Sequence, residues 1–405
     1  MRAHLRLPIL LLFVLSGCLS CSREAPFTPV ECQYFVEETF SRDVSFDDVF
    51  RSIKKEYEAV GVDADAFISK YDTEIRMVRL LSQPYAAHGI TYHTVDVEGN
   101  PVIASGVVYY PKTGASGFVV ELSPHNEWKG GCVTKNPMPS ELAMAMRGQV
   151  CLIPDLVGFG STEEYPIAFL QHDNIARVSA DLRAAAGEFI HNKYHFDISR
   201  SSVIWGYSLS GSAALALERF YQFHPERNVR VKTVYSGGGL YDFGLAFAEI
   251  MEKGELGYAL MPSLLYSLNH YARLNFDFDV LFKEPLREHV DDWAAGFLPA
   301  DELCGFIGTR IADYIDMDHF SPGCPMYDDY IAAAAGLKIP FDWVPSCPVR
   351  LFHAGADETI PRTGTDNLAA YLKEAGADVT YIVEEDVTHR EMYFVMCKDF
   401  IANVH

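Results

Sequence analysis

The segment 201–218 constrains the fold of this chain more than any other, because three local structures meet there within a few residues. The apolar run Val203–Trp205 is typical of a buried strand, and 213–218 (Ala-Ala-Leu-Ala-Leu-Glu) is typical of a helix. Between them lies the hexapeptide 206–211 (Gly-Tyr-Ser-Leu-Ser-Gly). Such a succession predicts a helix that folds back closely over the strand, which requires small residues around the turn.

Two serines are candidates for the apex of this turn. With Ser208 at the apex, Gly206 and Ser210 are the small residues two places to either side, as in the G-x-S-x-G pattern of a nucleophile elbow, although the last position here is serine. With Ser210 at the apex, Ser208 and Ser212 are the small flanks, but the turn then begins further from the strand. We favour Ser208. The alternative without catalytic meaning is an ordinary helix N-terminus capped by serine.

A nucleophilic serine needs a base and an acid, and candidates follow in the chain order Ser, Asp, His. The run 349–353 is typical of a buried strand, and Asp357 lies in the turn after it. A helical stretch over 362–375 and a short strand over 379–383 come next, and His389 follows that strand. The chain between Asp357 and His389 has room for this helix and this strand and little else. We therefore expect the two residues at adjacent strand ends.

Chemistry gives each of these residues a role. Ser208 is a weak nucleophile at neutral pH, so a neutral His389 must accept its proton, and Asp357 must orient the imidazole and stabilise the resulting cation. Taken singly, Asp357 is also consistent with a helix cap, and His389 with one surface histidine among 14. Three matches in order, each at a predicted strand end, favour the catalytic interpretation.

From about Ile90 to the C-terminus, the sequence resembles an α/β-hydrolase, and most of all the secretory lipase and esterase branch found in microbes. Besides the elbow, 92–106 is similar to the first β-hairpin of that branch. The segment 153–161 (Ile-Pro-Asp-Leu-Val-Gly-Phe-Gly-Ser) is similar to its P-D-x-x-G-x-G loop, and 236–242 (Ser-Gly-Gly-Gly-Leu-Tyr-Asp) to its glycine-rich segment after the sixth strand. The resemblance implies a Ser-Asp-His triad that works without a cofactor.

The sequence departs from this family at the loop after the third strand. That loop usually carries His-Gly or a similar pair, and one of its N–H groups donates to the oxyanion; here 123–128 reads Ser-Pro-His-Asn-Glu-Trp. The histidine is present and the glycine is not. We assign the Leu209 N–H as one oxyanion donor and Asn126 as the other, and expect His125 to brace the loop.

The remaining pattern agrees with an α/β fold. Apolar runs near 90–97, 102–110, 117–122, 149–154 and 201–206 alternate, after the opening hairpin, with amphipathic helices. Runs of this length between helices favour a mostly parallel central sheet with helices on both faces.

The stretch between Ser208 and Asp357 is far longer than the fold requires, so the sequence predicts an insert. We place a helical cap or lid at 243–342, between core segments 46–242 and 343–405. Its aromatic side chains are typical of an apolar acyl pocket and equally of core packing. The acidic run 313–319 lacks the glycine and terminal glutamate of a calcium loop, so it predicts a solvated surface and no metal site.

The N-terminus is typical of an export signal. Basic residues in 1–6 precede an apolar core, Leu7–Leu15, of about nine residues, too short to span a bilayer. Leu15–Cys18 (Leu-Ser-Gly-Cys) resembles the lipobox of bacterial lipoproteins, which implies a signal peptide over 1–17 and lipidation of Cys18. A leader that looks extended is expected over 18–45. The rival interpretation is ordinary cleavage near Ser20 or Ser22.

Charge and cysteine content restrict the partners. The formal net charge of −22 disfavours nucleic acid and anionic lipid headgroups as partners. Export permits disulfides among the cysteines other than Cys18, and Cys304 with Cys324, both in the cap, is the pair to test. Cys151 lies inside an apolar strand and is expected to be a small buried hydrophobe.

Together these observations predict a lipid-anchored serine hydrolase that cleaves small-molecule or lipid carboxylic esters at the bacterial cell envelope, at the outer membrane. A serine peptidase of the same fold is an alternative, although neither a propeller domain nor an acidic pair for an amine is recognisable. A non-catalytic binding lipoprotein of the envelope is a second alternative. The presence of all three triad candidates argues against it.

Overall fold

The structure of the protein, a computed structural model, describes residues 27–59, 64–123 and 128–404. In this described part, nine strands form one sheet in the order β1-β2-β3-β5-β4-β6-β7-β8-β9. The strands are β1 (Phe35–Val44), β2 (Tyr85–Val95), β3 (Pro101–Pro111), β4 (Val119–Leu122), β5 (Val150–Pro154), β6 (Ser201–Tyr207), β7 (Arg230–Gly237), β8 (Val349–Ala354) and β9 (Val379–Glu384).

The sheet is mostly parallel, as the short apolar runs predicted. β4 pairs in parallel with β5 and β6, and parallel pairing continues through β7 and β8 to β9. β1, β2 and β3 form an antiparallel edge. Every residue of β4 is buried, as expected for a central strand covered on both faces. Because parallel strands end at one edge, the residues that follow β6, β8 and β9 are brought close together.

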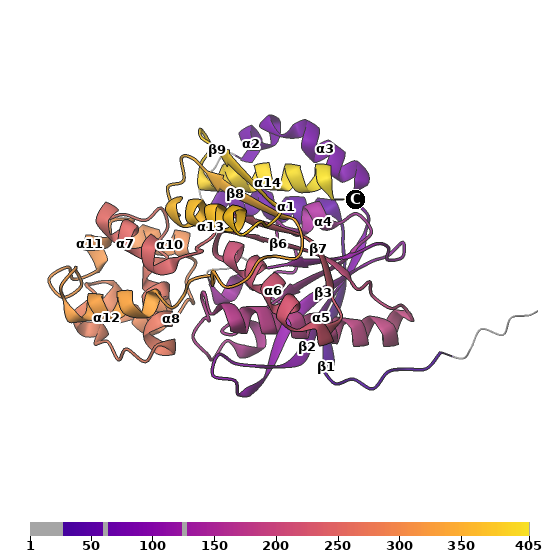
Figure 1. The fold of residues 1–405 in the computed structure, drawn as a ribbon, viewed down its shortest axis with the longest axis horizontal. Helices are drawn as coiled ribbons and strands as arrows, with labels where there is room; N and C mark the ends of the chain where they lie inside the picture. The colour runs from indigo at the N-terminus through magenta and orange to yellow at the C-terminus, as the bar shows by residue number, and fades with distance from the viewer. Residues whose placement is uncertain (1–26, 60–63, 124–127, 405) are drawn as a thin grey trace, which may run out of the picture.

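Helices cover both faces of this sheet (Figure 1). One face packs against α5, α6 and α13, and the other against α1, α4 and α14. Outside the cap, the helices are α1 (Phe46–Ala59), α2 (Ala64–Lys70), α3 (Asp72–Leu81), α4 (Leu142–Ala145), α5 (His172–Tyr194), α6 (Gly211–Phe223), α13 (Thr363–Glu374) and α14 (His389–Asn403).

The segment between β7 and β8 is helical and gathers at one end of the molecule (Figure 1). Its aromatic side chains pack on one another, and the ring centroids of Phe247 and Tyr330 lie 4.6 Å apart. These rings belong to one apolar cluster that extends through the insert. Its helices are α7 (Phe243–Lys253), α8 (Met261–Tyr271), α9 (Phe278–Leu281), α10 (Ala300–Ile307), α11 (Ile311–Tyr314) and α12 (Pro325–Ala334). We call this segment, 243–342, the cap.

The N-terminal segment contributes more to the fold than the extended leader expected over 18–45. Its described part ends in β1, which pairs along β2 and forms an edge of the sheet. Upstream of the strand, the carboxylate of Glu188 in α5 accepts the backbone N–H groups of residues 33–35 at 2.8–2.9 Å. β1 was hard to recognise because most of its residues are exposed, so its apolar alternation is weak.

The cysteine pair singled out in the cap is not bridged. Cys304 accepts the backbone N–H of Ala259 at 3.1 Å, while Cys324 lies 3.5 Å from the hydroxyl of Ser321. Cys151 is buried in β5, as expected. Within the described ranges there is no cluster of three or more His, Cys, Asp or Glu side chains able to hold a metal ion. No helix among the described residues is long and apolar enough to cross a membrane.

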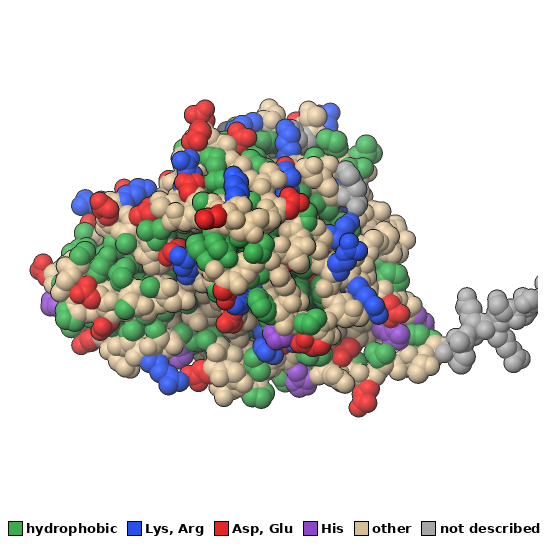
Figure 2. Space-filling model, viewed as in Figure 1, with side chains coloured by type: hydrophobic (Ala, Val, Ile, Leu, Met, Phe, Trp, Pro, Cys, Tyr) green, Lys and Arg blue, Asp and Glu red, His purple; other side chains and the backbone are tan. Residues whose placement is uncertain are grey.

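The surface is mixed in charge. On the face shown in Figure 2, acidic and basic side chains are interspersed between hydrophobic ones. The excess of acidic residues is therefore not gathered into one patch on this face.

A buried ion pair joins the centre of the sheet to two helices of one face, α5 and α6. Glu121 of β4 accepts hydrogen bonds from Arg183 of α5 at 3.2 Å and from the hydroxyl of Tyr221 of α6 at 2.6 Å. Arg183 also donates to the hydroxyl of Ser202 at 2.7 Å and to the carbonyl of Ser199. The Arg183 and Glu121 side chains are only 6 % and 4 % exposed, so each charge depends on its partners.

We therefore expect Arg183→Met to lower the free energy of unfolding by about 3–5 kcal/mol, because it leaves the Glu121 charge buried without its cation. Urea denaturation at pH 7 measures the change. The exposed pair Arg273–Glu98 supplies the control, and Arg273→Met should cost less than about 1 kcal/mol. Equal losses in the two variants would contradict a structural role for the buried pair.

Candidate active site

The turn after β6 has the strained geometry that its sequence predicted. Ser208 has φ +57°, a left-handed backbone conformation that non-glycine residues rarely adopt and that costs about 1–3 kcal/mol. It begins a short 3-10 turn, Ser208–Ser210, that runs directly into α6. Ser210 is buried, with φ −97°, at the start of that helix. Ser208 is therefore the apex of the turn, and Ser210 is not.

The glycines of the motif are required by close contacts. A Cβ at Gly206 would lie 2.1 Å from the carbonyl oxygen of Ser210, far closer than real Cβ atoms approach backbone atoms. A Cβ at Gly211 would lie 2.7 Å from the carbonyl oxygen of Gly237, at the end of β7. Gly211, one place beyond the usual motif position, thus lets α6 pack against the neighbouring strand end.

Parallel pairing brings Asp357 and His389 to the same edge of the sheet. β8 and β9 are adjacent, and their last residues, Ala354 and Glu384, are paired. Asp357 lies in the turn after β8, and His389 is the first residue of α14. A capping box formed by Thr388 and Glu391 fixes the start of this helix.

Three side chains meet at this edge within hydrogen-bonding distance. His389 Nε2 lies 2.9 Å from Ser208 Oγ, and His389 Nδ1 lies 2.7 Å from Asp357 Oδ2. A carboxylate only accepts, so Nδ1 carries the imidazole proton and Nε2 is free to accept from the serine hydroxyl. The Asp357 and His389 side chains are buried, while Ser208 remains partly exposed. This arrangement can remove a proton from an accessible hydroxyl.

The surroundings of Asp357 favour its ionised form. Its Oδ1 accepts the backbone N–H groups of Thr359 at 2.9 Å and Ile360 at 2.7 Å. Burial acts to raise the pKa of Asp357, but the charge and hydrogen bond of His389 and the Ile360 N–H outweigh it, so this pKa is lowered from its ordinary value. The site therefore holds a carboxylate next to the histidine.

Two residues that sequence reasoning missed hold the backbone of His389. The Glu358 carboxylate accepts the His389 N–H at 3.1 Å, and the Tyr207 hydroxyl donates to the His389 carbonyl. Both are sequence neighbours of predicted site residues, since Tyr207 precedes Ser208 and Glu358 follows Asp357. That adjacency was the only signal in the sequence.

Of the two residues assigned to an oxyanion hole, only Leu209 lies in the described part of the chain. Leu209 is the second residue of the 3-10 turn, where amide groups have no carbonyl partner inside the helix. Asn126 lies outside the described residues, as do His125 and the lipidation candidate Cys18. The assignment of Asn126 stays a prediction.

An apolar surface adjoins Ser208. Leu209 and Leu156 are partly buried and pack against the apolar cluster of the cap, which includes Leu256 and Leu260. A polar contact also joins the cap to the start of α14, because Arg390, next to His389, donates to the hydroxyl of Tyr258. The cap therefore lies directly against the site.

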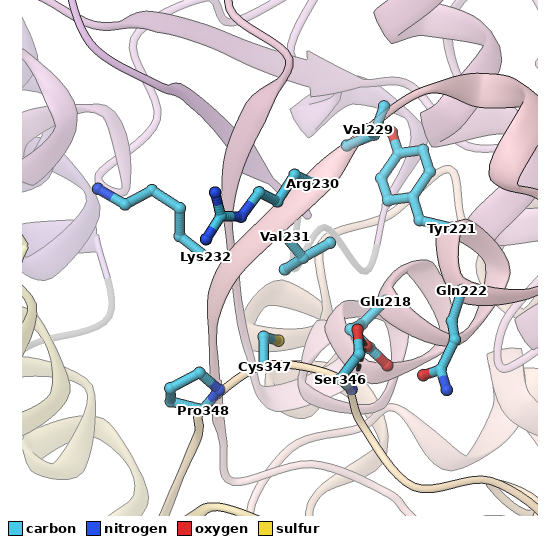
Figure 3. A pocket seen from close by; sticks show the side chains of 10 residues that line it. All are labelled: Glu218, Tyr221, Gln222, Val229, Arg230, Val231, Lys232, Ser346, Cys347 and Pro348. Carbon is cyan, nitrogen blue, oxygen red and sulfur yellow. Dashed lines mark hydrogen bonds between the residues drawn. The ribbon is translucent and has the colours of Figure 1, made fainter.

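A hollow of about 380 Å³ lies away from this site (Figure 3). It is lined by Glu218 of α6, by the first residues of β7, including Arg230 and Lys232, and by Ser346–Pro348 before β8. Because it is at the start of the parallel strands and Ser208 is beyond the end of β6, the two features occupy opposite edges of the sheet.

Comparison with known proteins finds likeness in structure only. No protein-family model matches this chain. No curated protein matches it either. Among solved structures, a hydrolase candidate from Legionella pneumophila aligns with a TM-score of 0.73 and 19 % identity, covering 91 % of this chain and 97 % of the other.

Two further matches carry functional names. The rice cell wall degrading esterase LipA from Xanthomonas oryzae aligns with a TM-score of 0.69 and 17 % identity, over 90 % of this chain and 95 % of that one. Candida antarctica lipase A in its closed state aligns with a TM-score of 0.56 and 12 % identity, over 89 % and 79 %.

These likenesses confirm the predicted fold class, because the nine-stranded, mostly parallel sheet with its helices is shared with α/β-hydrolase folds of the lipase and esterase type. At such low sequence identity, these structural likenesses establish the fold alone. The secretory branch and the lipoprotein assignment stay predictions.

The close approach at Gly206 generates a test of the turn. Gly206→Ala should lower the free energy of unfolding by about 1–3 kcal/mol, because the new Cβ would collide with the Ser210 carbonyl. Thermal denaturation of the variant and the wild type measures this loss of stability. Gly305 in α10 is the matched control, since nothing lies within 4 Å of its Cβ position, and Gly305→Ala should be neutral or stabilising. A neutral Gly206→Ala variant would refute the requirement for a small residue.

The ionised Asp357 predicts a pH-dependent part of the stability. Its pKa is lower in the folded than in the unfolded chain, so its carboxylate stabilises the fold above about pH 4, and this is lost as the pH falls through the folded-state pKa. The wild type should therefore exceed Asp357→Asn in urea midpoint at pH 7, by a margin that narrows towards pH 3. A margin independent of pH would contradict the assignment.

Proposed function

We propose that this protein is a serine hydrolase that cleaves carboxylic esters through an acyl-enzyme intermediate. The observation that carries the proposal is the chain of contacts from Ser208, on a strained turn, through His389 to the ionised Asp357. The structural likeness to an esterase and a lipase supports esters as the substrate class.

We propose one proton path through these contacts. His389 Nε2 takes the proton of Ser208 Oγ as the oxygen attacks the ester carbonyl, and a bond forms between serine and the acyl carbon. Asp357 holds the imidazolium by its hydrogen bond to Nδ1. The proton then passes to the leaving alcohol. In the second half, His389 takes a proton from water as the water oxygen attacks the acyl carbon. The bond between this carbon and Ser208 Oγ then breaks, and His389 returns the proton to Ser208, which releases the acid and restores the free serine.

The carbonyl oxygen becomes negative in both halves and needs donors. We assign the Leu209 N–H, which follows the nucleophile at the start of the helix, and Asn126 as the loop donor. Positive potential at the N-terminus of α6 adds to this stabilisation.

The apolar surface formed by Leu209, Leu156 and the cap cluster suits an apolar acyl group. We therefore propose that the cap is a lid over the acyl site and that small-molecule or lipid esters are the substrates. No step of this chemistry calls for a cofactor.

The first experiment is hydrolysis of p-nitrophenyl esters from acetyl to palmitoyl by the protein lacking residues 1–21. We expect turnover that Ser208→Ala lowers by about 10⁴-fold or more, because the nucleophile is lost. Ser210→Ala is the matched control and should keep its activity. Labelling of Ser208 by a fluorophosphonate, read by peptide mass spectrometry, provides a second readout. A folded protein that cleaves no ester, or loses turnover in Ser210→Ala alone, would refute the proposal; amide substrates would then follow.

We also propose that the chain is anchored at the bacterial cell envelope, at the outer membrane, by lipid on Cys18. In the described part, Phe27 stacks on His195, at the end of α5, and the first described residues lie at the end of the molecule opposite the cap (Figure 1).

Metabolic labelling with an alkyne palmitate tests this anchor. The full chain should take up label and sediment with membranes, whereas Cys18→Ser should do neither; Cys21→Ser is the matched control and should behave as wild type. Labelling that persists in Cys18→Ser would exclude this cysteine as the anchor.

A further inference from the structure

A second histidine lies beside the triad contacts and takes no part in the proton path described above. His353 is near the end of β8 and is completely buried. Its ring sits between the turn that carries Asp357 and the first residues of α13. A buried titratable group so close to a reacting network requires an explanation.

The partners of His353 define its protonation. Its Nε2 lies 3.1 Å from the carbonyl oxygen of Ile360, which can only accept, so Nε2 carries a hydrogen. Its Nδ1 lies 2.8 Å from the Thr365 hydroxyl, which can donate to it. Both ring nitrogens are thus satisfied by a neutral imidazole in a single tautomer.

These contacts hold both backbone polar groups of one residue in the Asp357 turn, Ile360. Ile360 donates its N–H to Asp357 Oδ1 at 2.7 Å, while its carbonyl accepts from His353 at 3.1 Å. His353 therefore holds from behind the residue whose amide supports the carboxylate.

His353 also faces the carboxylate itself. Its Nε2 is 3.6 Å from Asp357 Oδ2, the oxygen that accepts from His389, which is too long for a hydrogen bond and short enough for electrostatic attraction. Asp357, His389 and Asp366 are the ionisable groups that act on the ring. Burial lowers the pKa of His353, which favours its neutral form.

We propose that His353 is a positioning residue for the hydrolytic reaction: by bonding to the Ile360 carbonyl it fixes the backbone of Ile360, whose N–H supports the Asp357 carboxylate, so that Asp357 stays oriented towards His389. This inference rests on the proposed function, and it concerns the geometry of Asp357 and His389, which can be measured without turnover.

Two substitutions at His353 distinguish the contribution of its hydrogen bond from that of the volume of its ring. His353→Leu removes the donor to Ile360, whereas His353→Gln can place an amide N–H close to the position of Nε2. We expect kcat to fall about 10- to 100-fold in His353→Leu with KM nearly unchanged, because the loss lies in the orientation of His389. His353→Gln should recover to within a few fold of wild type.

Histidine NMR on the same proteins reads the effect on His389 without substrate. In His353→Leu the pKa of His389 should fall by about half a unit or more, because a less well aimed carboxylate stabilises the imidazolium less. His353→Gln should titrate as wild type. If the wild type cleaves no ester, the titration still tests the positioning role, so failure of the two proposals can be told apart.

His88→Leu is the matched control. His88 is also buried and bonded at both ring nitrogens, to Glu38 and Tyr194, but it lies on β2, and its replacement should lower stability without changing kcat or the His389 titration. Equal kcat losses in His353→Leu and His353→Gln, an unchanged kcat in His353→Leu, or an unchanged His389 titration would each overturn the positioning role.

Discussion

The close approach of α6 to β6 is the constraint on which the candidate site depends. Because Gly206 has no side chain, the carbonyl of Ser210 can come back over the strand, and Ser208 is held in a conformation that serine does not choose by itself. The strain is maintained by packing on both sides, since Gly211 meets the end of β7 in the same way. The Ser208 hydroxyl therefore lies at the same edge of the sheet as Asp357 and His389.

The buried carboxylates of Glu121 and Asp357 are stabilised in two different ways. At Glu121, burial is compensated by an arginine and two hydroxyls, and the result joins the sheet to two helices. At Asp357, the compensation comes from two backbone amides and a histidine that can gain and lose its proton. The first arrangement suits a fixed charge. The second suits the proposed role of Asp357 beside a histidine that takes up a proton, a role that His353 is proposed to support through Ile360.

The cap and the first described residues lie at opposite ends of the molecule (Figure 1). The cap lies at one end, against the site, and the N-terminal segment leaves the other end along α5. The hollow beside Arg230 is at the edge of the sheet opposite Ser208. The cap and the candidate site therefore lie together, away from the hollow and from the first described N-terminal residues.

The sequence by itself determined the elements that are local or ordered along the chain. The apolar strand before 206–211, the small residues around Ser208, and the order of Ser208, Asp357 and His389 predicted the fold class and the sheet edge, because strand periodicity and turn chemistry act over a few residues. The edge strand β1 escaped recognition because it is largely exposed. The unbridged cysteines of the cap could not be foreseen, because a cysteine count carries no distances. Only the tertiary structure decided which serine is at the apex, that Glu358 and Tyr207 hold His389, and that His353 stands behind Asp357, because these are contacts between separate strand ends that burial and backbone geometry create.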